Sequence, residues 1–233
     1  MKKINLCLLF LISIGVLKAQ SIVSLNQTLG YGQTHAIFAF NDRYDGLEGN
    51  PYFFDDKYHD GEIWLTQNRH YEKDYQYKFD QLTSTVLLKY PNGKEILLDA
   101  KDILSFNMFI EDKTVTFVRV QLSDSKEATV AQLIYWSPKL KLLRDIKKKL
   151  LRNKENGAYN DGKVTDKVVN DYRYYFSKND AELVFIKPTK KGFIKALPNK
   201  EIELERLFKT KEFKDDLTVS KLAELMQKLD VDK

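Results

Sequence analysis

The sequence predicts a mainly β protein, an antiparallel meander folded as a sandwich or a partly open barrel, with a short C-terminal helical segment. Three observations support this. Apolar and polar residues mostly alternate between residues 47 and 197, which is the period of a strand. Turn-forming residues separate most of these runs. From residue 198 to 233, apolar residues recur instead at the spacing of amphipathic helices.

The first nineteen residues have the layout of a secretory signal peptide. Met1-Lys2-Lys3 gives a basic start, residues 4–17 are almost wholly apolar, and Ala19 is a small residue at the expected cleavage point. The apolar stretch is shorter than the ~20 residues of a permanent membrane-spanning helix, so an uncleaved anchor is the weaker alternative. We therefore expect an exported protein, periplasmic or secreted, cleaved near Ala19 and beginning with an N-terminal segment over residues 20–46.

Composition and charge restrict the possible partners. The chain has 233 residues, 10 Gly and 5 Pro, with 12% aromatic residues, which is atypical of collagen or of a disordered chain. Its formal net charge of +5 would fall to +2 on cleavage, because three lysines and no acidic residue leave with the signal. So small a charge gives no reason to expect nucleic acid as a partner. The sequence after residue 19 contains no second long apolar run, so we expect no membrane-spanning helix in the mature chain.

Cysteine usage is equally restrictive. The single cysteine is Cys7, which lies within the predicted signal peptide. We therefore expect the mature chain to have no disulfide, no thiolate nucleophile and no cysteine-based zinc site.

The strand candidates follow one another along the body of the chain. In residues 75–79 the alternation places Tyr75, Tyr77 and Phe79 on one face. Asn92-Gly93 lies between two alternating runs and predicts a hairpin with a type I′ turn, because both residues tolerate a positive φ. The remaining candidates are residues 61–66, 86–90, 96–98, 103–109, 114–122, 130–136, 172–176 and 183–186.

One segment allows two interpretations. Ser137-Pro138 could cap and open a helix that carries Leu143, Ile146 and Leu150 at helical spacing. Residues 139–142 alternate instead as a strand would, and we favour a strand through about residue 145. The polar, glycine-containing stretch over residues 153–170 predicts a long loop.

The end of the chain changes in character. A short strand-like run over residues 193–197 precedes Pro198. We expect Asn199 to cap a first helix, and Thr218 or Ser220 to cap a second. These two helices would cover one side or end of the sheet and protect an edge.

The strongest charge feature is a run of basic residues between residues 139 and 154, relieved only by Asp145. It could bind an anionic lipid surface, a polysaccharide or an acidic partner. The alternative is a solvated face that deters edge-to-edge aggregation. The predicted binding residues are Lys139, Lys141, Arg144, Lys147, Lys148, Lys149 and Arg152.

Other candidate sites have ordinary structural explanations. Asp56, His59 and Asp60 could support metal binding or acid–base hydrolysis, but aspartates beside Gly61 are also typical of a turn. The acidic loop over residues 41–46 lacks the closing glutamate of a calcium loop. Eight aromatic residues could line a ligand cavity, but their alternation favours a role in the core. They are Tyr71, Tyr75, Tyr77, Phe79, Tyr172, Tyr174, Tyr175 and Phe176.

Several of these pieces occur together in a familiar order. Residues 50–55 read Asn-Pro-Tyr-Phe-Phe-Asp just before the first glycine-led strand, and a hairpin, a basic leucine-rich strand, a tyrosine-rich strand and a helical end follow. This order resembles a loose family of uncharacterised bacterial exported proteins, in which a Pro-Tyr-Leu-Phe-like motif opens a β-rich domain. The resemblance covers about residues 47–229 and implies a strand over residues 139–145. It implies no activity, ligand or catalytic residue.

These features favour an exported, non-catalytic protein of the cell envelope that binds an envelope protein, a glycan or an anionic surface. We assign no catalytic residue, no metal ligand and no cofactor. Two alternatives stay open at this point. One is a metal-assisted or acid–base hydrolase that uses Asp56, His59 and Asp60. The other is a small barrel that binds an apolar ligand between aromatic faces.

Overall fold

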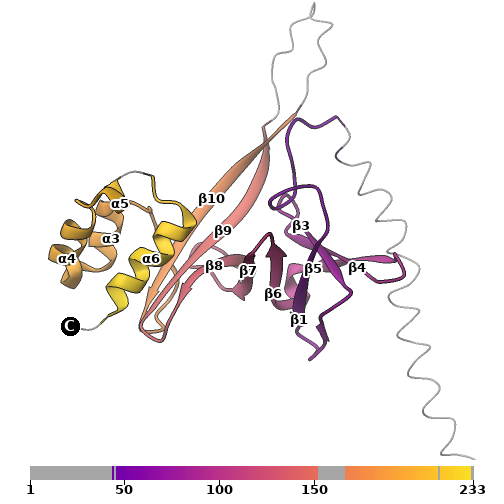
Figure 1. Ribbon diagram of the computed structural model, residues 1–233, viewed down its shortest axis with the longest axis horizontal. Helices are drawn as coiled ribbons and strands as arrows, with labels where there is room; N and C mark the ends of the chain where they lie inside the picture. The colour runs from indigo at the N-terminus through magenta and orange to yellow at the C-terminus, as the bar shows by residue number, and fades with distance from the viewer. Residues whose placement is uncertain (1–43, 45, 152–165, 215, 232–233) are drawn as a thin grey trace, which may run out of the picture.

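The computed structural model describes residues 44, 46–151, 166–214 and 216–231 (Figure 1). The predicted signal peptide, nearly all of the N-terminal segment over residues 20–46, Arg152 and most of the predicted loop over residues 153–170 lie outside these ranges. The acidic loop over residues 41–46 lies almost entirely outside them as well.

The strands of the described ranges form one open, antiparallel, eleven-stranded sheet, which confirms the predicted mainly β fold. Their order is β11-β10-β9-β8-β7-β6-β1-β3-β4-β5, with β2 beside β1. Most neighbours in this order are also neighbours along the chain, as in a meander. The strands are β1 His59–Leu65, β2 His70–Tyr71, β3 Gln76–Asp80, β4 Thr85–Lys89, β5 Glu95–Asp99, β6 Ile103–Ile110, β7 Lys113–Val120, β8 Thr129–Trp136, β9 Leu140–Leu151, β10 Lys167–Lys178 and β11 Val184–Ile186.

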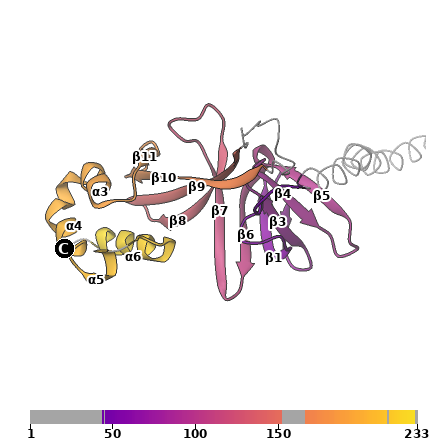
Figure 2. The same ribbon diagram turned by 90° about the horizontal axis from the view of Figure 1, so that it is seen from above.

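The helical end of the chain lies beside one half of the long strands β8, β9 and β10 (Figures 1 and 2). This confirms the predicted C-terminal helical segment. The short 3₁₀ helix η1 Ala100–Asp102 lies apart from it, between β5 and β6. The C-terminal elements are α3 Lys190–Ala196, η2 Pro198–Lys200, α4 Glu201–Leu207, α5 Lys211–Lys214 and α6 Val219–Asp230.

The helical segment begins earlier than the sequence predicted. The strand expected over residues 193–197 is wrong, because this run lies within α3 and its C-cap. Thr189 starts the helix, its side-chain oxygen accepting a hydrogen bond from the backbone N–H of Gly192 at 3.2 Å. A Cβ atom at Gly192 would lie 2.1 Å from the carbonyl oxygen of Lys187, so glycine permits a close approach that a larger residue would block.

Of the two predicted helix caps, the first is wrong and the second is confirmed. Asn199 caps no helix, since it lies inside η2, and Lys200 precedes α4 without a side-chain capping bond. Thr218 caps α6 as predicted, because its side chain accepts a hydrogen bond from the backbone N–H of Lys221 at 3.3 Å.

The hairpin at Asn92-Gly93 is confirmed in place, but its predicted turn type is wrong. The N–H of Gly93 donates to the carbonyl of Tyr90 at 2.9 Å, so Pro91 and Asn92 are the central residues. Proline fixes φ near −65°, which a type I′ turn does not accept at this position. Gly93, with φ of +81°, follows the turn in the left-handed region. This is the type I turn with a following glycine that longer hairpin loops use.

The disputed segment after Trp136 is a strand, as favoured. Ser137 does not open a helix, because its side-chain oxygen accepts hydrogen bonds from the N–H groups of Lys139 and Leu140 and thereby closes the turn into β9. Strand β9 pairs with β10 residue by residue from Leu140↔Lys178 to Leu151↔Lys167. The predicted loop over residues 153–170 therefore ends too late, since residues 167–170 belong to β10.

Two hydrophobic clusters hold the fold together. The first, which we call the sheet cluster, lies among β1 and β3–β9 and includes the stacked rings of Phe106 and Phe117, with centroids 4.4 Å apart. The second, the helix cluster, joins β9, β10 and β11 to the C-terminal helices. Of the eight aromatic residues, Tyr77, Phe79, Tyr175 and Phe176 are buried, and the others pack against the clusters partly buried. Their predicted role in the core is confirmed.

Residues 46–54, which we call the strap, run across one end of the curled sheet. Glu48 forms a bridge with Lys167 at the start of β10, and Phe53 donates its N–H to the carbonyl of Phe79 at 2.8 Å. The Lys148 ammonium of β9 donates to the carbonyls of Asn50 and Tyr52 at 2.7 and 2.6 Å. The strap thereby connects β3 to β9 and β10, which lie far from β3 in the order of strands.

The second half of β9 also contacts Gln81, the residue that directly follows β3. The buried side chain of Gln81 donates to the carbonyl of Ile146 at 2.6 Å, and the N–H of Lys148 donates to the carbonyl of Gln81 at 3.1 Å. These contacts bring the turn between β3 and β4 close to β9. The candidate site lies beside this contact between the β3–β4 turn and β9.

Candidate functional site

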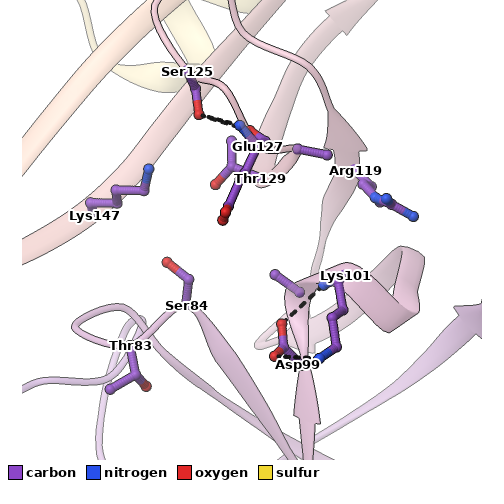
Figure 3. A pocket seen from close by; sticks show the side chains of 11 residues that line it. Thr83, Ser84, Asp99, Lys101, Arg119, Ser125, Glu127, Thr129 and Lys147 are labelled. Atoms are coloured by element: carbon purple, nitrogen blue, oxygen red, sulfur yellow. Dashed lines mark hydrogen bonds and ion pairs between the residues drawn. The ribbon is translucent and has the colours of Figure 1, made fainter.

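A polar cleft of about 630 Å³ opens where β9, the β3–β4 turn and the β7–β8 loop meet (Figure 3). Its volume lies within the ~300–1,000 Å³ typical of ligand sites. Residues of β5, η1, β7, β8 and β9 and of two connecting turns line it, and only Ala100 and Ala128 among these residues are apolar. The lining residues are Thr83, Ser84, Asp99, Ala100, Lys101, Arg119, Ser125, Glu127, Ala128, Thr129 and Lys147.

Local hydrogen bonds hold the rim of the cleft in place. Asp99 caps η1, since its carboxylate accepts the backbone N–H of Lys101 at 3.1 Å and lies 3.5 Å from the ammonium of the same lysine. Ser125 donates its hydroxyl to the carbonyl of Glu127 at 2.7 Å and shapes the opposite loop. Figure 3 shows Glu127 and Thr129 on one side of the cleft and Ser84 facing them from the other.

The charges of the cleft are mixed, with three cations and two carboxylates. Lys101 is close to Asp99, and Lys147 lies 3.3 Å from the carboxylate of Asp145. Arg119 is exposed and makes no ion pair with another residue of the described ranges. The guanidinium of Arg119 is thus the cation most available to a ligand.

Behind Lys147 lies a buried carboxylate. Asp145 is only 4% exposed, and its Oδ1 has no hydrogen-bond partner within the described residues. Burial raises the pKa of the Asp145 carboxyl above its ordinary value, and the nearby Lys147 ammonium only partly opposes this. The Asp145 carboxylate therefore helps to position Lys147, but burying its charge lowers the stability of the folded protein.

The neighbouring β10 residues form a second polar network. The Tyr175 hydroxyl donates to the carboxylate oxygens of Asp124 at 2.8 and 2.9 Å, and the Arg173 guanidinium lies 3.3 Å from the same carboxylate. Burial, together with the hydrogen bond to Asp124, raises the pKa of Tyr175 to about 12. Asp124 lies in the β7–β8 loop that carries Ser125 and Glu127, so this network anchors one wall of the cleft.

We expect Asp145→Asn to stabilise the protein at pH 7. Because the folded-state pKa lies above the unfolded value, the folded protein binds more protons between the two values and loses stability as the pH rises through that window. The amide carries no charge to desolvate, so its advantage should be present at pH 7 and vanish near pH 3. Urea unfolding of both proteins across this range measures the difference. A variant less stable than the parent at pH 7 would contradict the expectation.

The structure separates the predicted basic residues. Within β9 the pleat places Lys141, Lys147 and Lys149 on one side and Arg144 and Lys148 on the other. They do not form one basic face.

Most of these cations already have partners. Lys141 pairs with Asp180, and its ammonium lies 4.0 Å from the Trp136 ring centroid. Arg144 donates to Gln132 at 2.6 Å, and Lys149 lies 3.5 Å from Asp171. Burial lowers the pKa of the inward-facing Lys148, while Asp80 opposes this effect. Lys139 lies in the turn before β9, and of the members of the set that the structure describes only Lys147 lines the cleft.

The predicted Asp56, His59 and Asp60 cluster is also dispersed. His59 lies 2.7 Å from Asp55, while Asp56 forms an ion pair with Lys78. Asp60 accepts a hydrogen bond from Gln76 at 3.4 Å on the adjoining strand. The three side chains therefore do not converge on one substrate position, and the geometry gives the hydrolase alternative no support.

Comparison with known proteins adds no further constraint. The chain matches no protein-family model, no curated protein and no solved structure. Across the residues that the structure describes, no helix is both long and apolar enough to cross a membrane. The resemblance to bacterial exported proteins stays a prediction from the sequence.

Proposed function

We propose that this protein is an exported, non-catalytic module of the cell envelope, and that it binds an acidic glycan in the polar cleft. The observation that carries the proposal is the lining of the cleft, which combines hydroxyl groups with charged side chains around an open volume of about 630 Å³. The signal-like first nineteen residues support the exported location.

The lining suits a polyhydroxyl ligand with negative charge. The hydroxyls of Ser84 and Thr129 can both donate and accept hydrogen bonds, as sugar hydroxyls require. The Ser125 hydroxyl, whose proton goes to Glu127, can only accept. Arg119 and Lys147 supply cations for a carboxylate or sulfate, and arginine can bind such a group through two parallel hydrogen bonds. Glu127 and Asp99 can accept hydrogen bonds from sugar hydroxyls.

The pairing of charges within the cleft further supports recognition. Lys101 and Lys147 are held by Asp99 and Asp145, which limits the side-chain freedom that a ligand would otherwise have to restrict. Arg119, which has no ion-pair partner in the part of the chain that the structure describes, is exposed and can reorient toward an incoming anion.

The test is a calorimetric titration of the purified protein with a hexameric oligogalacturonate, an acidic glycan. Neutral maltohexaose is the comparison. We expect binding of the acidic glycan only, weakening as salt increases. The double variant Arg119→Gln/Lys147→Gln should bind at least ~10-fold more weakly, because each charge-assisted hydrogen bond contributes on the order of 1.5–3 kcal/mol.

The matched control is Lys191→Gln/Lys195→Gln, which removes the same charge from α3, far from the lining residues. It should bind like the parent. Equal losses in both double variants would show attraction to net charge only and would overturn the cleft as the site. Absence of binding, or equal binding of maltohexaose, would overturn the acidic glycan. Lys148 is left unchanged because it holds the strap.

A further inference from the structure

We infer that Glu62, His70 and Glu72 form a binding site for a divalent transition metal ion such as Zn²⁺. One ligand atom from each of the three residues lies within 4.8 Å of the other two. The Nε2 atom of His70 is 3.6 Å from Oε2 of Glu62. None of the three residues lines the polar cleft, so this site is independent of the proposed function.

The register of the first hairpin produces this arrangement. Strand β2 pairs with β1 so that Ile63 faces Tyr71 and Trp64 faces His70, which places Glu62 opposite Glu72. Two carboxylates directly opposite each other on neighbouring strands repel and destabilise the pair. A divalent cation between them would remove this repulsion, and the diagonal His70 would complete a three-sided group of ligands.

Residues outside the group hold two of the ligands in position. The imidazole of His70 stacks on the Trp64 ring, with centroids 4.5 Å apart and planes 12° from parallel. The Asn107 amide of β6 donates to Oε1 of Glu62 at 2.8 Å, which leaves Oε2 directed at His70. Metal ligands in proteins commonly have such orienting partners.

Asn107 makes this contact at a cost. Its Oδ1 is buried and has no hydrogen-bond partner among the described residues. An unpaired buried acceptor is energetically unfavourable, while the Nδ2 group of the same amide orients Glu62. The bond from Asn107 therefore fixes the orientation of the Glu62 carboxylate.

The ligand chemistry selects the metal class. One imidazole nitrogen with two carboxylate oxygens suits Zn²⁺, Co²⁺ or Ni²⁺ better than Ca²⁺ or Mg²⁺, which prefer oxygen ligands alone. His70 and Glu72 lie toward solvent, since the His70 side chain is 36% exposed. An ion can therefore enter, and its remaining positions stay open to water.

Trp64 provides a direct readout. The chain has two tryptophans, so Trp136→Phe leaves Trp64 as the sole indole emitter. Titrating this untagged, chelator-treated protein with Co²⁺ should quench most of its tryptophan emission, because the ion would sit against the ring stacked on Trp64. Added Zn²⁺ should restore the emission by displacement, and calorimetry with Zn²⁺ alone should give one ion per chain.

Matched substitutions locate the ligands. In the same background, Glu72→Gln and His70→Gln should each weaken Zn²⁺ binding at least ~10-fold, and Asn107→Ala should weaken it by ~10-fold through the lost orientation of Glu62. Glu72 is exposed, so its substitution leaves folding intact. His59→Gln is the control, since His59 pairs with Asp55 instead.

Each result decides the question. Unquenched Trp64 emission at millimolar Co²⁺ would overturn the site, and so would unchanged Zn²⁺ affinity in Glu72→Gln. Equal loss in His59→Gln would place the ion elsewhere and would overturn it too.

Discussion

Phe117→Ala is expected to lower the free energy of unfolding by about 3–5 kcal/mol, the usual cost of removing a buried aromatic ring. Phe117 is fully buried in the sheet cluster. Its ring stacks on Phe106 at 4.4 Å and meets Phe53 and Phe79 edge-on at 5.1 and 5.3 Å. Phe53 belongs to the strap, so the substitution leaves a cavity where the strap joins the sheet. Urea unfolding followed by circular dichroism measures the change.

Phe109→Ala is the matched control for this prediction. Phe109 lies on β6 beside β7, but its side chain is 42% exposed. Truncating it leaves no enclosed cavity, and the expected loss is below about 1.5 kcal/mol. Similar losses in the two variants would mean that the four-ring contact does not stabilise the fold as described.

Asp80→Ala is expected to cost about 3 kcal/mol or more, because it leaves several donors without their acceptor. Asp80 is wholly buried, and its Oδ1 accepts the N–H groups of Leu82 and Thr83 at 2.9 and 3.1 Å. Its Oδ2 accepts the hydroxyl of Tyr44. Removing the carboxylate also removes the negative charge of Asp80 that stabilises the partly buried Lys148 ammonium. Thermal and urea unfolding should show the loss together.

Two further substitutions separate the causes of that loss. Asp80→Asn retains Oδ1 as an acceptor for the turn, so we expect a smaller loss than with alanine. Asp112→Ala removes an exposed aspartate from the β6–β7 turn and should change stability by no more than about 0.5 kcal/mol. If Asp80→Ala behaved like Asp112→Ala, the turn would not depend on the buried carboxylate.

The sequence predicted the strands well because their pattern is local. Residues 75–79 alternate between aromatic and polar side chains, and alternation by itself specifies a pleated strand with one buried face. The strand prediction for residues 193–197 was wrong because a five-residue, largely apolar run fits a strand or a helix equally well. Thr189, four residues earlier, was the informative signal, since its side chain caps α3.

The candidate sites were beyond the reach of local patterns. The polar cleft joins Ser84, Lys101, Arg119 and Lys147, which meet only because the sheet curls and the strap binds β9. The charge run over residues 139–154 looked continuous in the sequence, yet the pleat of β9 divides it between two faces. Glu62 and Glu72 meet because of the register of one hairpin, which its turn sets and which the pattern of neither strand alone reveals.

The strap has a consequence for the order of events in folding. Lys148 reaches back 98 and 96 positions to Asn50 and Tyr52, and the pair between Lys167 and Glu48 spans 119 positions. A ribosome must therefore have synthesised most of the polypeptide before these early residues can find their partners. Chains whose contacts are so distant in sequence fold slowly. For the exported protein that we propose, such a delay would keep the polypeptide unfolded until it had been threaded through a translocation channel.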